Sequence, residues 1–531
     1  MNWTFPPSRS LRARGRALLQ PGLLWGSILL IALVGTYSCG HPPSNLHTLV
    51  FLLESSPVSL DPRVGTDAFS ERLHQLLFNS LVRRDIHADL QPDLATGWKT
   101  PDSLTYEFHL RPHVLFHNGQ PLTSRDVRYT FESILDGKIN TVKRRQYQII
   151  AQIQTPDAYT VIFKLKEPNA NFLWLLSLGE IGIVPHTAGP EFANHPVGTG
   201  PFRFESMRED ENVTLMSNPG YYDGPPRVKR VLFKIVPEAI VRALEMRSGS
   251  ADVALNELTP DIVHALNSDK KLVVIEQPGT TYKYLAFNLQ DPLLRNLKVR
   301  QAIAYAIDIP ALIHYLWRDE GDPATGILPP NVWAYEPNVT KYSRDLSKAR
   351  ALLDEAGYPD PDGEGPLPRF TLTYKTSTEE LSRSEASVIQ QQLREVGIGV
   401  EIRSFEFATF YSDIVRGNFQ MYSLRWIGDN LNPDIFDAVF GSGNIPPDGK
   451  NRGHYHNPRV DQLILWARSE PDRAVRKGYY SQIQSIVAED LPYLSLWNIH
   501  NVCIANRRVK NIHLYPSGDF DFLKEVILEG E

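Results

Sequence analysis

The spacing of three histidines raises the question of a metal site. They recur at intervals of four residues, at His109, His113 and His117. On a helix such residues would share one face, as the zinc ligands of hydrolases do. Tyr106, Phe108 and Leu110 instead alternate with polar residues, which indicates a strand. Residues four apart on a strand lie about 13 Å from one another, too far to share one ion. A zinc hydrolase is therefore the weaker interpretation, and we predict no metal site.

Other catalytic signatures are missing from the sequence. It has no G-x-x-x-x-G-K-[ST] phosphate loop, no G-x-S-x-G nucleophile turn, no H-E-x-x-H zinc helix and no paired C-x-x-C. Cys503 is a lone thiol between Val502 and Ile504, so we expect a buried structural cysteine rather than a reactive one. The sequence therefore predicts a protein that is not an enzyme and needs no cofactor.

The stretch around Asp429 favours a binding function. Tyr422, Leu424 and Trp426 share one face of a predicted strand, which ends at turn-forming residues that begin with Gly428. Open α/β sheets place their ligands at the ends of strands. The carboxylate of Asp429 could pair there with a cationic group of a ligand, or it could cap the turn, which is a common role of aspartate.

The elements that would position this stretch alternate between helical and strand patterns, which predicts an α/β fold. Helical spacing of apolar residues recurs at residues 73–81, 299–306, 346–356 and 389–396. Asp345 and Gly357 are expected to cap and end the third helix. The fourth is expected to end at Gly397 and to be followed by a half-buried strand in which Val400 and Ile402 are apolar.

The first 38 residues differ from the rest of the chain. Four arginines without any acidic residue precede an uncharged, mostly apolar run at residues 23–35, shorter than the roughly 20 residues of a membrane-spanning helix. The run leads to a site that resembles those cleaved before a lipid-bearing cysteine, here Cys39, although Thr36 stands where leucine is usual. We therefore expect a signal peptide at residues 1–38, a lipid on Cys39 and a tether at residues 39–45. A plain signal peptide and an uncleaved anchor are the alternatives.

Composition and charge exclude other classes of protein. At 531 residues the chain is too long for one hydrophobic core, so two or three structural units are expected. Hydrophobic residues at 42% and charged residues at 22% exclude a disordered protein. Without the four leader arginines, 51 basic face 61 acidic residues, a net charge of about −10 that argues against nucleic acid as a partner. Proline and glycine are dense at residues 359–368 and 441–453, which are predicted to be surface loops or connectors.

Many short blocks, in order along nearly the whole chain after the leader, carry a resemblance to a known family. They include Tyr106, Glu107, Phe108, His109, Leu110 and Arg111; Phe116, His117, Asn118 and Gly119; Gly198, Thr199, Gly200, Pro201 and Phe202; and Val299, Arg300, Gln301, Ala302 and Ile303. Together they resemble the family 5 extracellular solute-binding proteins, which serve dipeptide and oligopeptide importers. The resemblance implies the α/β, two-lobed periplasmic binding protein type II fold with an additional inserted domain. The implied units are lobe one at residues 46–66, 198–276 and 500–531, lobe two at 67–197 and a third domain at 277–499, with the family region at about 90–450.

The resemblance also implies a ligand site. In peptide-binding relatives the carboxylate after the Trp-x-Gly segment pairs with the α-ammonium of the ligand, which implies this role for Asp429, with Trp426 and Gly428 beside it. A buried ammonium needs such a partner because an unpaired charge in a closed cleft is costly. Trp426 would line a side-chain pocket or belong to the core. The first-lobe edge of the family implies peptide contacts at Ser55 and Ser56.

Two departures from the family concern charge. Asn432 stands where the family usually has aspartate, which lowers the negative charge near Asp429. No arginine clearly occupies the position at which dipeptide binders hold the ligand carboxylate. Lys375 and Arg383 are the candidates, and we expect both to be exposed to solvent.

The function that the resemblance implies is that of the extracytoplasmic binding subunit of an ABC importer. It would capture di- or oligopeptides by closing its lobes and deliver them to a membrane permease. The expected partners are a small peptide and the permease subunits, and the expected state is a monomer, lipid-anchored on the periplasmic or cell-surface side of the cytoplasmic membrane. Relatives also take nickel chelates, haem, glutathione, opines or sugars, so a non-peptide solute is the first alternative. A zinc hydrolase and a structural or chaperone-like envelope protein are the alternatives from other classes.

Overall fold

The computed structural model describes residues 47–529, apart from residues 178, 180, 364 and 448, and it leaves the side chain of Asp429 undescribed. The predicted signal peptide, the lipid site at Cys39 and the tether at residues 39–45 lie outside the described residues. These three features therefore stay predictions.

A mixed sheet of eleven strands runs through the described chain. Its strands are, in order across the sheet, β15 (Ile398–Phe405), β14 (Phe370–Ser377), β16 (Met421–Trp426), β12 (Leu272–Phe287), β17 (Tyr493–Asn506), β11 (Val253–Leu255), β1 (Thr48–Leu53), β10 (Arg230–Ile235), β9 (Asn212–Ser217) and β8 (Phe202–Arg208), with β13 (Gly321–Pro323) paired to β17. The order of the strands across the sheet differs from their order along the chain, so segments hundreds of residues apart become neighbours.

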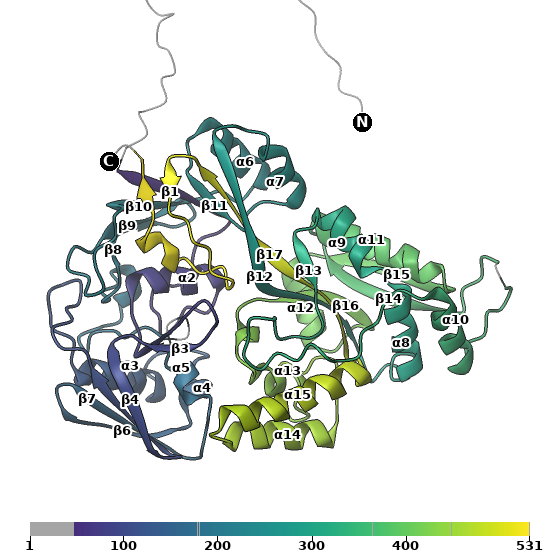
Figure 1. Ribbon diagram of the computed structural model, residues 1–531, viewed down its shortest axis with the longest axis horizontal. Coiled ribbons are helices and arrows are strands. Elements are labelled where there is room, and N and C mark those ends of the chain that lie inside the picture. The colour runs from purple at the N-terminus through teal and green to yellow at the C-terminus, as the bar shows by residue number, and fades with distance from the viewer. Residues whose placement is uncertain (1–46, 178, 180, 364, 448, 530–531) are drawn as a thin grey trace, which may run out of the picture. The chain divides into compact units, whose positions relative to one another are not determined.

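Strands β12 and β17 are the longest and lie side by side, antiparallel, in the middle of this sheet (Figure 1). The first half of β12 pairs with the end of β17 near strand β11, and its second half pairs with the start of β17 near strand β16. Their register is interrupted between Gln277 and Thr281. An added Cβ at Gly279 would lie 2.2 Å from the carbonyl oxygen of Ile499, so only glycine fits at this interruption.

A second, antiparallel sheet of four strands lies within the first two hundred residues. Its strands and the nearby elements are β4 (Ala95–Asp102), β5 (Thr105–Leu110), β7 (Thr160–Leu165), β6 (Ile150–Asp157), α3 (Ser124–Leu135), α4 (Arg144–Tyr147), α5 (Phe172–Leu175) and the pair β2 (Val82–Arg84) and β3 (Leu90–Pro92). Phe108, Phe131 and Phe163 pack edge to face between this sheet and α3. This unit thus has a hydrophobic core of its own.

Helices follow strand β12 in the sequence and surround strands β14 to β16. They are α8 (Leu297–Ala306), α9 (Ile309–Trp317), α10 (Leu346–Glu355), α11 (Glu380–Arg394), α12 (Phe407–Val415), α13 (Ile435–Phe440), α14 (Pro458–Ser469) and α15 (Arg473–Asp490). The predicted caps are confirmed: Asp345 accepts from the Lys348 amide at 2.9 Å, and Gly357 has a left-handed φ of 90°. Gly397 likewise ends α11 before β15, as predicted.

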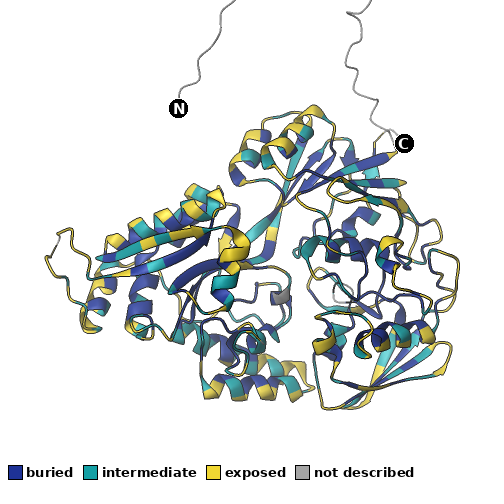
Figure 2. Cartoon of the chain, turned by 180° about the vertical axis from the view of Figure 1, so that it is seen from behind, coloured by how far each residue is buried: buried dark blue, intermediate teal, exposed yellow. Residues whose placement is uncertain are grey.

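The remaining elements are short. They are α2 (Ala68–Leu77), α6 (Ala239–Ser248), α7 (Pro260–Leu266), η1 (Phe192–Asn194), η2 (Asp429–Leu431), η3 (Asp521–Lys524), β18 (Val509–Lys510) and β19 (Ile527–Leu528). Figure 2 shows buried strands beneath helices whose outer faces are exposed. Separate cores surround β1 with β8 to β11, fill the four-stranded unit and cover the two faces of β12 and β16. The residue bounds predicted for the lobes and the third domain stay predictions.

Candidate ligand site at the end of strand β16

Strands β1 and β16 belong to different halves of the large sheet, yet both end toward its middle. Trp426, the last residue of β16, pairs with Tyr282, next to the register interruption of β12. Leu255 ends β11, which runs parallel to β1, and pairs with Cys503 on the side of β17 that leads to the same interruption. The segments that follow β1 and β16 are therefore directed at the same central part of the long strands.

The segment after β16 is held in place by its own turn. Gly428 has a left-handed φ of 79° and open space around its α-carbon, so the backbone conformation, not crowding, favours glycine there. A short 3-10 turn, η2, follows. Asn430, fully buried, donates from Nδ2 to the carbonyl oxygens of Thr280 at 2.7 Å and Ile327 at 3.1 Å. The turn that carries Asp429 is thus fixed to strand β12.

The end of this segment is equally fixed. Asn432 accepts a hydrogen bond from the amide of Asp434 at 3.1 Å, so the residue that departs from the family pattern closes a turn. Asp434 is paired with Arg468, with 3.0 Å between Oδ1 and Nε. Burial raises the pKa of Asp434, and the charge of Arg468 opposes this effect. A partly exposed ion pair therefore helps to hold the start of α13.

Asp429 opens the 3-10 turn η2, but its side chain lies outside the described part of the structure. Its pairing with a ligand ammonium stays a prediction. Trp426 is buried in the core between β16 and the helices, where its ring lies 6.3 Å from that of Tyr284. Its indole Nε1 has no hydrogen-bond partner among the described atoms.

The two predicted serine contacts follow strand β1 directly. Ser55 is exposed, and Ser56 accepts a hydrogen bond of 2.8 Å from the amide of Asp210, in the turn between β8 and β9. Among the described side chains, no hydrogen bond joins either serine to the segment after β16. The structure therefore directs both segments toward one region.

Lys375 and Arg383 are the two candidates for binding the carboxylate of the ligand, and the exposure of one of them differs from the prediction. We predicted that Lys375 is exposed, and this is wrong: it is 5% exposed, and its Nζ lies 2.6 Å from Oδ2 of Asp413. This partner, 38 residues away in the sequence, neutralises the ammonium, so Lys375 has little charge left for a ligand. Arg383 is exposed as expected.

The three histidines do not form a common site. His109 lies on strand β5, as the alternation predicted, beside Glu107 at 3.3 Å. His113 has a left-handed φ of 63°, and His117 is held between the backbones of Gly198 and Gly200 at 3.2 and 3.1 Å. Burial lowers the pKa of His117 to about 4. Within the described ranges, no group of three or more His, Cys, Asp or Glu side chains is arranged to hold a metal ion.

The lone thiol behaves as predicted. Cys503 is fully buried on β17, and burial raises the pKa of its thiol to about 12. A thiol that stays protonated and inaccessible is a poor nucleophile. Cys503 therefore has a structural role.

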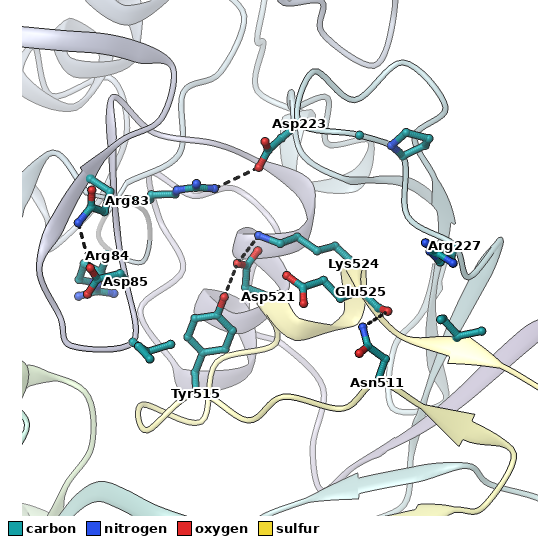
Figure 3. Close-up of a pocket in the computed structure, with 15 residues that line it drawn as sticks. Arg83, Arg84, Asp85, Asp223, Arg227, Asn511, Tyr515, Asp521, Lys524 and Glu525 are labelled. Carbon is teal, nitrogen blue, oxygen red and sulfur yellow. Dashed lines mark hydrogen bonds and ion pairs between the residues drawn. The ribbon is translucent and has the colours of Figure 1, made fainter.

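A broad hollow of about 690 Å³ lies between the β2 and β3 pair and the C-terminal segment (Figure 3). Its charged side chains largely pair with one another: Arg83 with Asp223 at 3.2 Å, and Lys524 with Asp521 at 2.7 Å. Asn511 donates to the carbonyl oxygen of Glu525, as the figure shows. Because these charged groups already have partners, they are less suited to bind a ligand. We therefore place the candidate site at the end of β16.

Arg452 is a residue that the sequence analysis did not single out. It lies in the stretch 441–453, which was predicted to be a surface loop or a connector, and Asn451, Arg452 and Gly453 in this stretch are buried. A surface position is therefore wrong for residues 451–453, which fold inward against β12. A Cβ added at Gly453 would lie 2.8 Å from the carbonyl oxygen of Phe287. Turn-forming residues indicate a change of direction, and they do not indicate exposure.

No helix in the described part of the chain is long and apolar enough to cross a membrane. A model of the family described as bacterial extracellular solute-binding proteins, family 5 Middle, matches residues 89–446. A probable di/tripeptide-binding protein 5 of Pseudomonas aeruginosa is 29% identical over 517 residues, which cover 91% of this chain and 96% of that protein. Heme-binding protein A of Haemophilus influenzae is 28% identical over 520 residues, 92% of this chain and 93% of that protein.

The solved structures include a close match in fold. The ABC transporter-associated periplasmic binding protein DppA from Helicobacter pylori, in complex with peptide STSA, superposes with a TM-score of 0.76 at 28% identity, covering 91% of this chain and 98% of that one. The mixed α/β architecture described above is that of type II periplasmic binding proteins. The chain belongs to the family 5 bacterial extracellular solute-binding proteins.

Proposed function

We propose that this protein captures short peptides outside the cytoplasmic membrane and delivers them to the permease of an ABC importer. The observation that carries the proposal is the arrangement of β1 and β16, whose ends are directed at the middle of the two long strands. A ligand bound there would lie between the segment that follows β1 and the segment that follows β16. Relatives named for peptide binding, in Pseudomonas aeruginosa and Helicobacter pylori, support peptides as the ligand class.

In this proposal the ammonium of the peptide pairs with Asp429, and Gly428 leaves room for the peptide backbone. Ser55 and Ser56 contact the peptide from the other side, at the end of β1. The lobes, at the bounds given above, close over the ligand by bending β12 and β17 near their register interruption. Closure would remove water from the charge pair and so strengthen it.

The proposal also includes the location of the protein. Residues 1–38 would direct export, and a lipid on Cys39 would hold the binding domain close to the permease. A bound peptide would then need to diffuse only along the membrane surface.

Peptide binding is tested with protein that has been unfolded and refolded to remove any bound ligand. We expect calorimetric titration with peptide STSA to show saturable binding at one site, and solution scattering to show a smaller radius of gyration with the peptide. Titration with haem is the comparison, because one relative is named for haem. Saturable haem binding without any peptide binding would contradict the proposal and favour the non-peptide alternative.

A further inference from the structure

The structure contains a buried arginine without an acidic partner. Arg452 is 6% exposed, and no carboxylate of a described side chain forms an ion pair with it. Among the described atoms its guanidinium donates only to phenol oxygens, from Nη2 to Tyr411 at 2.8 Å and from Nη1 to Tyr284 at 3.4 Å. A guanidinium keeps its charge at every physiological pH, so burial without a counter-charge is costly.

The other buried arginines show how unusual this is. Four arginines are buried among the described residues: Arg63, Arg242, Arg300 and Arg452. Arg63 forms an ion pair with Asp61 at 2.7 Å. Arg242 and Arg300 each donate three hydrogen bonds, of 2.6 to 3.0 Å, to backbone carbonyl oxygens. Of these four, only Arg452 has neither a carboxylate nor a carbonyl oxygen as a hydrogen-bond partner among the described atoms.

Arg452 lies directly beside the candidate ligand site. Its Cζ is 5.2 Å from the ring centroid of Trp426 and 5.0 Å from that of Tyr411. These two rings hold the guanidinium plane by cation–π attraction, which orients the group without neutralising it. Trp426 is three residues before Asp429, so the cation borders the segment to which the proposed function assigns the ligand.

The surroundings of Arg452 also contain unused hydrogen-bond donors. The buried ring of Tyr284 stacks on that of Tyr493 and meets that of Tyr422 edge to face. The hydroxyls of Tyr422 and Tyr493 and the Nε1 of Trp426 have no partner among the described atoms. Tyr411, which also contacts the guanidinium, is 39% exposed, so this side of the cluster is close to solvent. The cluster is thus rich in donors and positive charge, and an anion is what it lacks.

We propose that Arg452 receives a carboxylate of the bound peptide. The inference rests on the proposed function, and it adds to the site a second residue that binds a charged group of the ligand. A planar guanidinium suits a carboxylate because two parallel N–H groups can reach both oxygens. The carboxylate is that of the peptide C-terminus or that of an acidic side chain. In either case the site selects peptides that carry an anionic group.

The experiment measures the affinity of full-length protein, stripped of ligand by unfolding and refolding, for three probes by calorimetry. The probes are peptide STSA, the C-terminal amide of STSA, and the amide of STEA, whose only carboxylate is a side chain. Arg452→Gln should weaken the binding of STSA roughly 30-fold to 4,000-fold, because it removes one member of a desolvated charge pair. Arg452→Lys should lose part of this affinity, because the charge remains but the fork is lost. Arg403→Gln is the matched control on the exposed strand β15.

The three probes separate the sources of the carboxylate. If wild type loses affinity for STSA amide and STEA amide restores it, a side-chain carboxylate can replace that of the C-terminus. If both amides bind weakly, only the C-terminal carboxylate is accepted. In either case the Arg452→Gln variant should no longer distinguish the probes. Equal affinity of wild type for STSA and its amide would contradict the inference. An Arg452→Gln variant that binds STSA well and still rejects the amides would overturn the inference while leaving the proposed function intact. Absence of any peptide binding by wild type would instead contradict the proposed function.

A ligand-free measurement decides whether Arg452 is unpaired before a ligand arrives. Arg452→Met fills the space between the rings with an uncharged chain. If the guanidinium has no internal counter-charge, the urea midpoint of the stripped variant should equal or exceed that of wild type. A clearly lower urea midpoint of Arg452→Met would contradict the inference, because it would show that the guanidinium has an internal partner. If Arg452→Met lowers the midpoint of wild type but not that of Asp429→Asn, that partner is Asp429.

Discussion

Asn430 donates a hydrogen bond of 2.7 Å from Nδ2 to the carbonyl oxygen of Thr280, which joins the turn after β16 to the register interruption of β12. A second bond, of 3.1 Å, reaches Ile327. Any bending of β12 at this interruption would therefore move the turn that carries Asp429. The hydrogen bond couples the candidate ligand site to the strand about which the lobes are proposed to close.

Replacing Asn430 by alanine should loosen this coupling. The change removes the donor for two carbonyl oxygens in a buried position, so the free energy of unfolding should fall by about 1–3 kcal/mol. Urea unfolding measures this loss, and binding of peptide STSA should weaken as well. Asn140→Ala, in an exposed loop, is the control and should leave both quantities unchanged. An Asn430→Ala variant with full stability and affinity would show that the turn is held by other contacts.

The stability of the protein should depend on pH through Glu257. Its carboxylate is buried next to the end of β1, where Oε2 accepts from the amide of Glu54 at 3.1 Å. Burial raises the pKa of Glu257 to about 7, opposed by the charge of Arg72 and reinforced by that of Glu54. The folded protein thus holds a proton that the unfolded chain releases near pH 4.5. The contribution of this proton to stability is complete below that pH and is lost as pH rises through about 7.

Glu257→Gln should remove this dependence, because the amide can still accept from Glu54 but does not titrate. We expect wild type and variant to have similar stability at pH 5, and the variant to be more stable by roughly 2–3 kcal/mol at pH 8. Urea unfolding at a series of pH values gives the difference. Glu209→Gln, at an exposed position, should follow wild type throughout. Parallel curves for wild type and Glu257→Gln would contradict the buried proton.

The two cysteines of the chain allow a direct test of the lipid anchor. Cys39→Ala should abolish incorporation of labelled fatty acid and release the protein from the membrane fraction, because the acceptor thiol is gone. Cys503→Ala should keep the label, since Cys503 is buried in β17. A wild-type protein that takes up no fatty acid would exclude the anchor and favour a plain signal peptide.

Local patterns predicted much of the fold. The cap at Asp345, the stop at Gly357 and strand β16 depend on neighbours in the sequence, and each is confirmed. The half-buried strand at residues 398–405 is confirmed too, with Val400 partly buried and Glu401 exposed. These features follow from periodicity and capping, which act over a few residues.

Burial of charged residues was not predictable in the same way. Lys375, on strand β14, can be buried because Asp413, on helix α12, pairs with its ammonium. Arg452 is enclosed by rings from β12, α12 and β16, which meet only in the folded sheet. The sequence shows each of these residues in a polar setting, and nothing local indicates the partner. Charged residues of the site therefore had to be found from the structure.

The ligand role of Asp429 is the most direct test of peptide binding. Asp429 begins the turn at the end of β16, which Gly428 and Asn430 hold in place. If its carboxylate pairs with the α-ammonium of the peptide in a closed site, Asp429→Ala should weaken binding of STSA by roughly 30-fold to 4,000-fold. Acetylation of the peptide N-terminus should weaken binding to wild type by a comparable factor, measured by calorimetry.

The two changes should not add, because each destroys the same charge pair. The coupling free energy from wild type and Asp429→Ala, each with free and acetylated STSA, measures the pair itself. A turn-capping Asp429 would behave differently: the variant would lose thermal stability but would still prefer the free peptide over the acetylated one. Because Asn430 keeps its own hydrogen bonds to Thr280 and Ile327, the turn should survive the substitution, so a folded variant is expected. Intact discrimination in that folded variant would remove the assignment of Asp429 and the main charge-based reason for preferring peptides over the other solutes of the family.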